Sequence, residues 1–258
     1  MNYWLFLLYT TISIAIFNSV GIALSFTKKY NAISKYLFIL SIVSQLILIV
    51  YIWSLKNTAP LQTIAETRIW YSFFISVVGL FIYFKYKIKW MNIFTTLMCL
   101  MFNIIVLVKD NTITTPTPPI LHSIWFIPHV SLYMVSYAIL GCAAILSIMN
   151  IFKENNKREN ICNQLLLIGT ICFSIGMILG SIWAYSAWSS FWSWDIKESI
   201  ALITWLVYLI SIHLSFTQKK SKWVSVLSII GFILLQICWW AKRIATMDRT
   251  SPDVIKEV

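Results

Sequence analysis

Charged residues are scarce: they make up 11% of the 258 residues, whereas hydrophobic residues make up 59%. A soluble domain is about one quarter charged, so this composition excludes an ordinary soluble fold. Apolar stretches recur along the chain, and each is near the roughly 20 residues that a helix needs to cross the hydrocarbon core. The short alternating segments of a membrane barrel do not occur in the sequence. The sequence therefore predicts an all-α, polytopic helical membrane protein.

Cysteine is also scarce, and no Cys-x-x-Cys pair is present. Buried cysteines usually behave as small hydrophobic residues. A disulfide framework or a thiol-exchange activity of this chain is therefore not expected. All the cysteines lie inside apolar stretches: Cys99, Cys142, Cys162, Cys172 and Cys238.

About eight membrane-spanning helices are expected. The first leads directly into further spans, so we interpret it as a retained helix rather than a cleaved signal peptide. We divide the chain into a four-helix membrane part (1–112), a core (113–245) and an external C-terminal tail (246–258). The expected helices are 3–26, 36–55, 69–87, 90–108, 127–152, 161–183, 198–217 and 223–244.

The net charge of +11 is concentrated in loops between the expected helices. Four short loops contain 12 of the 20 Lys and Arg residues and alternate with less basic connections. By the positive-inside rule these loops are cytoplasmic, which places both termini outside. Topology therefore explains the charge, and no nucleic-acid partner is expected. The basic residues are Lys28, Lys29, Lys35, Lys85, Lys87, Lys89, Lys153, Lys157, Arg158, Lys219, Lys220 and Lys222.

The connection between the sixth and seventh expected helices, residues 183–198, is unusually aromatic. Six of the twelve residues from Trp183 to Trp194 are aromatic, and only Ala and Ser separate them. Aromatic residues at a membrane face can be an anchoring belt. Rings packed this densely also suit stacking against a large flat ligand such as a porphyrin. Asp195 follows the run, where it can orient the loop or cap the next helix.

The chain has three histidines. His213 lies within the seventh expected helix, toward its cytoplasmic end, where an ionisable group is costly and indicates function. The alternative for His213 is a hydrogen bond to a neighbouring helix. His129 follows Pro128 at the outer start of the fifth helix. His122 would lie about 10 Å from it along a helix axis, so the two cannot ligate opposite faces of one porphyrin iron. We expect His122 to be a loop residue.

The aromatic segment resembles a known signature. The run from Trp183 to Ser199, continued by Ala201-Leu-Ile-Thr-Trp, is similar to the tryptophan-rich WWD signature of haem-handling proteins in cytochrome c maturation. Its details resemble the CcsA (ResC) branch of System II. The segment Trp125–Gly141 is similar to the external histidine region of the same family. The resemblance covers residues 118–245 and extends to the first four helices only in topology.

The resemblance implies a subunit of a System II cytochrome c synthase in the bacterial inner (cytoplasmic) membrane. Such a protein moves haem b across the membrane and presents it at the outer face for thioether attachment to the CxxCH motif of apocytochrome c. It acts by binding and positioning haem, and a ResB/CcsB-like membrane subunit is the implied partner. His129 would be the ligand of external haem iron and His213 that of transmembrane haem iron. The implied haem cradle consists of Trp183, Trp188, Trp192, Trp194 and Asp195.

The sequence departs from the family at one point. The family usually carries a second external histidine after its last helix, whereas no histidine follows His213 in this chain. Three explanations are compatible with the sequence: Met247 as a thioether ligand, a ligand from a partner subunit, or an endpoint other than haem. Two other functions also fit. One is a haem exporter or haem-binding membrane protein without attachment chemistry, and the other is a structural subunit whose aromatic residues are only anchors.

Overall fold

The computed structural model describes residues 3–56, 58–109, 121, 123–217 and 221–248. Within these ranges it contains eight long helices, one short 3-10 helix and no strand. All eight are long and apolar enough to cross a membrane. The predicted polytopic all-α architecture is therefore confirmed. The elements are α1 (Tyr3–Ser25), η1 (Lys28–Tyr30), α2 (Asn31–Lys56), α3 (Ile64–Tyr86), α4 (Met91–Lys109), α5 (Phe126–Phe152), α6 (Asn156–Trp188), α7 (Ile196–Phe216) and α8 (Ser221–Asp248).

Helix α6 is longer at both ends than the expected range 161–183. It begins after Asn155, whose side chain accepts a hydrogen bond from the backbone N–H of Arg158 at 3.0 Å and so caps the first turn. It ends at Ser189, which has a left-handed backbone (φ 57°) and whose N–H donates to the Tyr185 carbonyl at 2.9 Å. The first half of the aromatic run is therefore helical rather than a loop.

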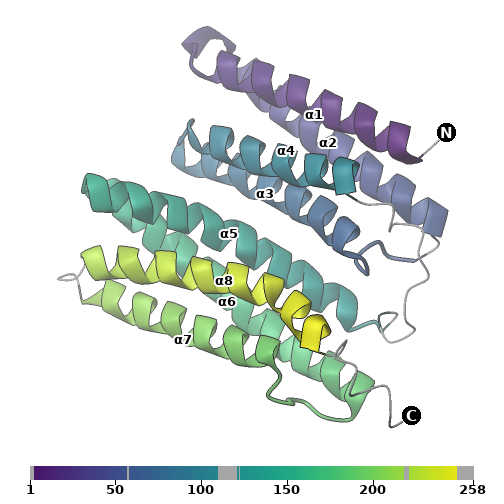
Figure 1. Ribbon diagram of the computed structural model, residues 1–258. Coiled ribbons are helices and arrows are strands. Elements are labelled where there is room, and N and C mark those ends of the chain that lie inside the picture. Colours follow the sequence, from purple (N-terminus) through teal and green to yellow (C-terminus); the bar gives the residue numbers. More distant parts are fainter. Residues whose placement is uncertain (1–2, 57, 110–120, 122, 218–220, 249–258) are drawn as a thin grey trace. The chain divides into compact units, whose positions relative to one another are not determined.

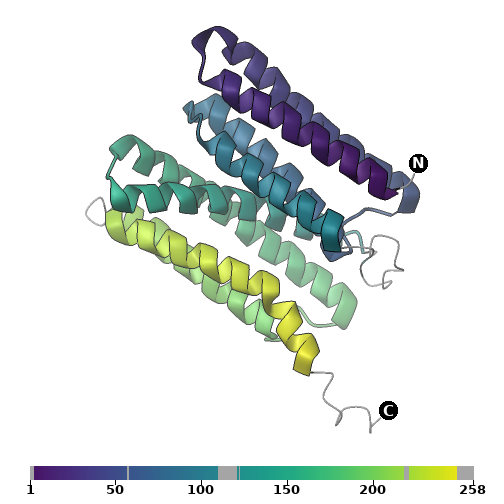
Figure 2. The same ribbon diagram turned by 45° about the horizontal axis from the view of Figure 1, so that its top comes forward.

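The chain divides into an N-terminal unit (1–138) and a C-terminal unit (139–258), and the boundary falls inside α5. In the N-terminal unit α1 packs against α2 and α4, and α3 packs against the same two helices, which closes an antiparallel four-helix bundle (Figure 1). In the C-terminal unit α7 packs against α6 and α8, as Figures 1 and 2 show. The predicted boundary between the four-helix part and the core at residue 113 stays a prediction.

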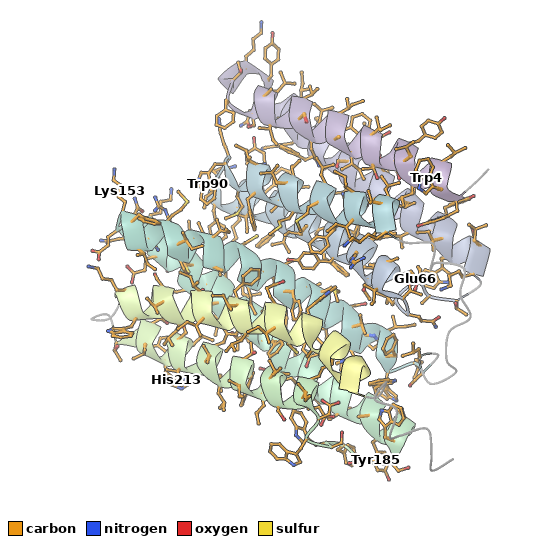
Figure 3. The ribbon with its side chains drawn as sticks, viewed as in Figure 1. Trp4, Glu66, Trp90, Lys153, Tyr185 and His213 are labelled. Atoms are coloured by element: carbon orange, nitrogen blue, oxygen red, sulfur yellow. The ribbon has the colours of Figure 1, made fainter. Side chains whose placement is uncertain are left out.

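One end of the four-helix bundle is apolar inside. A buried cluster from all four helices fills it, and Trp4 closes its edge by donating from Nε1 to the Leu107 carbonyl at 3.2 Å. Glu66 lies at the same end, at the start of α3, opposite the end near Trp90 (Figure 3). The buried cluster consists of Leu7, Leu48, Ile49, Ile52, Ala65, Ile69 and Val106.

Glu66 joins α2 to α3. Its carboxylate accepts hydrogen bonds from the backbone N–H groups of Gln62 (2.8 Å) and Thr63 (2.9 Å) and pairs with the Lys56 ammonium. The Thr63 side chain in turn accepts from the Glu66 N–H at 3.2 Å, which completes a capping box. The carboxylate side chain is fully buried and that of Lys56 is 13% exposed. The buried carboxylate of Glu66 is therefore paired with a cation.

The middle of the same bundle is polar. Gln45 Nε2 donates to Ser76 Oγ at 3.1 Å and lies 3.3 Å from Cys99 Sγ. Asn103 Nδ2 donates to Ser72 Oγ at 3.2 Å and to the Cys99 carbonyl at 2.9 Å. These five residues form a polar network that links α2, α3 and α4 at membrane depth. Hydrogen bonds between helices take the place of hydrophobic attraction, which lipid does not supply.

In the C-terminal unit, polar contacts also hold neighbouring helices together. Arg158 Nη1 donates to the Met149 carbonyl at 2.9 Å, which ties α6 to the end of α5. Trp205 Nε1 donates to Ser174 Oγ at 2.8 Å and ties α7 to α6. Between α7 and α8, the Tyr208 ring fills the space that a side chain at Gly231 would occupy. Small residues allow this close approach of helix backbones.

Candidate functional site: an exposed aromatic segment

The aromatic segment, residues 183–198, consists of the last turns of α6, a short connection and the first turn of α7. Two residues with positive φ shape the connection: Ser189 (57°), which ends α6, and Trp194 (58°), which precedes α7. Neither is glycine, so the surrounding contacts must hold each in a conformation that L-residues rarely adopt. The connection is therefore a defined turn between two helix ends.

Two acids brace this turn. Asp195 Oδ1 accepts a hydrogen bond from the Glu198 N–H at 2.7 Å, so Asp195 caps α7 as its position predicts. The Glu198 carboxylate reaches back and accepts from the Ser193 N–H at 2.7 Å and from its hydroxyl at 3.3 Å. The sequence offers two roles for Glu198, to orient the loop or to meet polar rim groups of a ligand, and its hydrogen bonds to Ser193 support the first.

Four rings of the segment face outward. The exposed fractions are 53% for Tyr185, 64% for Trp188, 55% for Phe191 and 70% for Trp194. Tyr185 and Phe191 stack with ring centroids 4.3 Å apart and an interplanar angle of 11°. This pair joins a ring on the helix to a ring on the connection. The result is an apolar, accessible surface made of flat side chains.

The other two tryptophans of the segment are half-buried. Trp192 meets Trp194 edge to face, with centroids 5.9 Å apart and an angle of 79°. Its buried Nε1 has no hydrogen-bond partner among the described residues. Trp183 lies on α6, five residues before its last residue, Trp188. Of the predicted cradle residues, the structure brings Trp192 and Trp194 into direct contact, and their assignment to haem stays a prediction.

His129 lies in the first turn of α5, directly after Pro128, and is half-buried. Its ring meets Tyr133 one turn further on, with centroids 4.7 Å apart and an interplanar angle of 71°. Tyr133 in turn lies 6.1 Å from Tyr137. The imidazole therefore begins an aromatic row along α5, in the part of the helix that belongs to the N-terminal unit. This row holds the ring against its helix.

His213 lies in the last turn of α7 and is exposed. Its Nδ1 lies 2.8 Å from the Leu209 carbonyl of the same helix. A carbonyl only accepts, so Nδ1 donates in this contact, and Nε2 is the ring nitrogen that this contact does not use. In the described part of the chain, the hydrogen bond of His213 stays within α7 rather than reaching a neighbouring helix, and the role of the residue stays a prediction.

His213 and the aromatic segment lie at opposite ends of α7 (Figure 3, where Tyr185 marks the segment). Between Asp195 and His213 the helix rises about 27 Å. The end of this unit near His213 also carries Lys153 and Lys222, whose ammonium lies 3.8 Å from Glu154. Several expected features lie outside the described residues: His122, Lys219, Lys220, the stretch 110–120, the tail 249–258 and the side chain of Met247.

The described chain is thus a multi-pass helical membrane protein with a braced aromatic surface at one helix end and an exposed imidazole at the other. The family model of the cytochrome c assembly protein matches residues 3–246. The chain therefore belongs to the cytochrome c assembly protein family, as a CcsA-type member. This confirms the resemblance seen in the sequence and extends it over the first four helices.

The alignments with two curated relatives differ in length: one spans most of this chain and the other about half of it. The cytochrome c biogenesis protein CcsA of Prochlorococcus marinus (strain MIT 9312) is 27% identical over 260 aligned positions, which span 85% of this chain and 84% of the relative. The CcsA protein of Mesostigma viride is 30% identical over 164 positions, 49% of this chain and 54% of the relative. The alignment with the first relative runs through most of the length of both proteins.

A solved structure shares the fold. The cytochrome c haem lyase CcmF matches with a TM-score of 0.68 over 91% of this chain, at 14% sequence identity. The chain spans 46% of the length of that protein. The likeness therefore supports the helical arrangement alone.

Proposed function

We propose that this chain is the haem-handling subunit of a System II cytochrome c synthase. It moves haem b to the outer face of the membrane and presents it for thioether attachment to the CxxCH motif of apocytochrome c. Family membership supports a role in cytochrome c maturation. The haem type, the transport step and the attachment step are the parts of the proposal that need experiment.

The observation that carries the proposal is the exposed aromatic surface. Anchoring in a membrane face needs rings on the outside of helices, and it does not need a turn braced by two acids. Here Asp195 and Glu198 fix the turn, while Trp188 and Trp194 remain mostly exposed. Flat apolar rings with polar groups beside them match the apolar faces and polar rim of a porphyrin. The residues present therefore fit haem as a substrate.

The two histidines supply the ligands that haem iron prefers. We assign His129, at the start of α5, to external haem iron. We assign His213, whose Nε2 is not used in its contact with Leu209, to transmembrane haem iron. Because His213 is exposed on α7, the second ligand of that iron would come from another chain, and a ResB/CcsB-like membrane subunit is the proposed partner.

The chain contributes positioning rather than acid or base catalysis. Attachment adds a cysteine thiol across a haem vinyl group, so the sulfur and the hydrogen go to the two vinyl carbons and no other reactant is consumed. Holding a flat substrate against fixed rings at the outer face brings the vinyl groups to the thiols, which lowers the entropic cost of the reaction. The proposed location is the bacterial inner membrane, with both termini outside.

The test compares haem retention by the purified chain in detergent. Trp188→Ala and Trp194→Ala are expected to lower the haem content, because each removes an exposed ring of the aromatic segment. Trp223→Ala is the matched control, because Trp223 is 60% exposed but lies at the start of α8, away from the segment. Equal haem loss in all three variants would show that the rings act as membrane anchors and would refute the haem surface.

Two further experiments measure iron ligation and covalent haem attachment separately. His129→Ala is expected to change the absorption spectrum of bound haem, since an imidazole ligand is lost. Co-production with the ResB/CcsB-like partner and an apocytochrome is expected to give covalent cytochrome c, detected by haem staining after denaturing electrophoresis. Haem binding without any covalent product under these conditions would favour a haem exporter over a synthase.

A further inference from the structure

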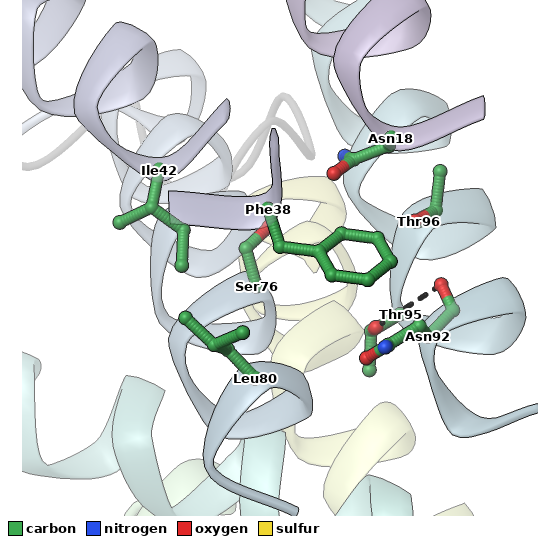
Figure 4. Close-up of a pocket in the computed structure, with 8 residues that line it drawn as sticks. All are labelled: Asn18, Phe38, Ile42, Ser76, Leu80, Asn92, Thr95 and Thr96. Atoms are coloured by element: carbon green, nitrogen blue, oxygen red, sulfur yellow. Dashed lines mark hydrogen bonds between the residues drawn. The ribbon is translucent and has the colours of Figure 1, made fainter. Parts of the chain in front are cut away.

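A small cavity lies inside the four-helix bundle of the N-terminal unit, and neither the aromatic segment nor the two assigned histidines line it. Its volume is about 10 Å³, and side chains from α1, α2, α3 and α4 line it. Figure 4 shows three amide or hydroxyl side chains of α4 facing the Phe38 ring, with Asn18 of α1 beside them. The lining residues are Asn18, Phe38, Ile42, Ser76, Leu80, Asn92, Thr95 and Thr96.

Asn92 is the polar group that needs a partner. Its side chain is 3% exposed, and its Nδ2 has no hydrogen-bond partner among the described residues. A buried amide donor without a partner is costly, so buried polar groups are almost always paired with protein or with ordered water. The nearby Thr95 hydroxyl donates to the backbone carbonyl of Asn92 at 3.4 Å rather than meeting this amide. The cavity is the space left for a partner of Nδ2.

The size and lining of the cavity identify its ligand. A volume of roughly 10–15 Å³ accommodates one water molecule, and such a water needs two to four polar partners. Amides and hydroxyls are present, whereas none of the eight lining residues is charged. An ion at this depth would be neither paired nor solvated, which is very costly. A single neutral hydrogen-bonding molecule remains.

We propose that this cavity is a buried water site that bridges Asn92 on α4 to Asn18 on α1. The site continues into the polar network through Ser76, which lines the cavity and also accepts from Gln45. Beyond Asn103 the bundle interior changes to the apolar cluster. The proposed water therefore lies in the half of the bundle near the basic loops, and the apolar cluster occupies the other half.

Radiolytic footprinting of the full chain in detergent tests the site, because X-rays generate hydroxyl radicals from bound water even inside a protein. Phe38 and Phe173 are both buried phenylalanines in membrane-spanning helices, but only Phe38 lines the cavity. We expect Phe38 to be oxidised several-fold faster than Phe173. In Asn92→Leu, which fills a similar volume without the donor, the Phe38 rate is expected to fall to that of Phe173. Asn103→Leu, the same change on the same helix outside the cavity, is expected to leave the Phe38 rate high.

Two results would overturn the proposal. Equal oxidation of Phe38 and Phe173 in the unmodified chain would mean that the cavity is dry, and this comparison requires no variant. Fast oxidation of Phe38 that persists in Asn92→Leu would mean that water reaches the ring by another route. Asn18→Leu repeats the test from the α1 side if Asn92→Leu does not fold.

Discussion

Asp195 permits a sharp test of what holds the aromatic segment. Its carboxylate makes two contributions: it accepts the Glu198 N–H at 2.7 Å as the cap of α7, and it places a negative charge at the N-terminus of the helix. Asn keeps the acceptor but not the charge, whereas Ala removes both. Stability is therefore expected to fall in the order Asp, Asn, Ala.

The magnitudes follow from the geometry. Loss of an Asp cap to Ala costs about 1 kcal/mol, and loss of an exposed charge at a helix N-terminus costs about 0.3 kcal/mol. Asp195→Ala should therefore lower the midpoint of thermal unfolding in detergent by about 2–4 °C. Asp195→Asn should lower it by less than half of that. Tryptophan fluorescence during a thermal ramp measures both.

Measuring haem binding by the Asp195 variants distinguishes a role of Asp195 as the cap of α7 from a direct contact of its carboxylate with haem. If Asp195 only caps α7, the Asp195→Asn variant retains haem like the unmodified chain, and the Asp195→Ala variant loses some because the turn loosens. If Asp195→Asn destabilised the protein as much as Asp195→Ala, the capping account would be wrong. Equal loss of haem in both variants without a difference in unfolding would instead assign the Asp195 charge to haem itself.

Three further substitutions test the packing of the helices by the same unfolding measurement. Glu66→Gln should lower the free energy of unfolding by about 3 kcal/mol, because the Lys56 charge stays mostly buried without its counter-ion. Adding Lys56→Met should restore most of this stability, and no recovery would refute the pairing. Gly79→Ala places a methyl group against the Thr95 side chain, closer than van der Waals contact allows, and should lower the free energy of unfolding by about 1–3 kcal/mol. The double variant with Thr95→Ala should lose less stability. An equal loss in both would show that the close contact is not the cause. Trp205→Phe removes the hydrogen bond to Ser174 on α6 and should lower the free energy of unfolding by about 0.6 kcal/mol. An unchanged unfolding midpoint would show that this hydrogen bond does not stabilise the protein.

The number of helices and their approximate ranges could be predicted because hydrophobic length alone defines a membrane span. The residue at which α6 ends could not be predicted. Ala and Ser between the aromatic residues do not end a helix, and α6 ends where Ser189 adopts a left-handed backbone conformation. A glycine would have indicated such a position in the sequence, whereas a serine does not. The basic-loop pattern marked the connections, but it did not show that Lys35 lies inside α2.

The candidate site was predicted as a set of residues but not as an arrangement. The cap at Asp195 follows from local rules that a sequence displays. The pairing of Tyr185 with Phe191 depends on backbone angles in the connection, which composition does not encode. The polar network around Cys99 was also missed. Isolated polar residues in an apolar run do not reveal which of them face one another until the helices are packed.

The four outward rings stand on two kinds of backbone. Tyr185 and Trp188 stand on the last turns of a long helix, whereas Phe191 and Trp194 stand on a seven-residue connection, 189–195, between helices. The helical rings are held by backbone hydrogen bonds, and the connection is held by the side chains of Asp195 and Glu198. A substitution of either acid would therefore displace one half of the aromatic surface and leave the other half in place.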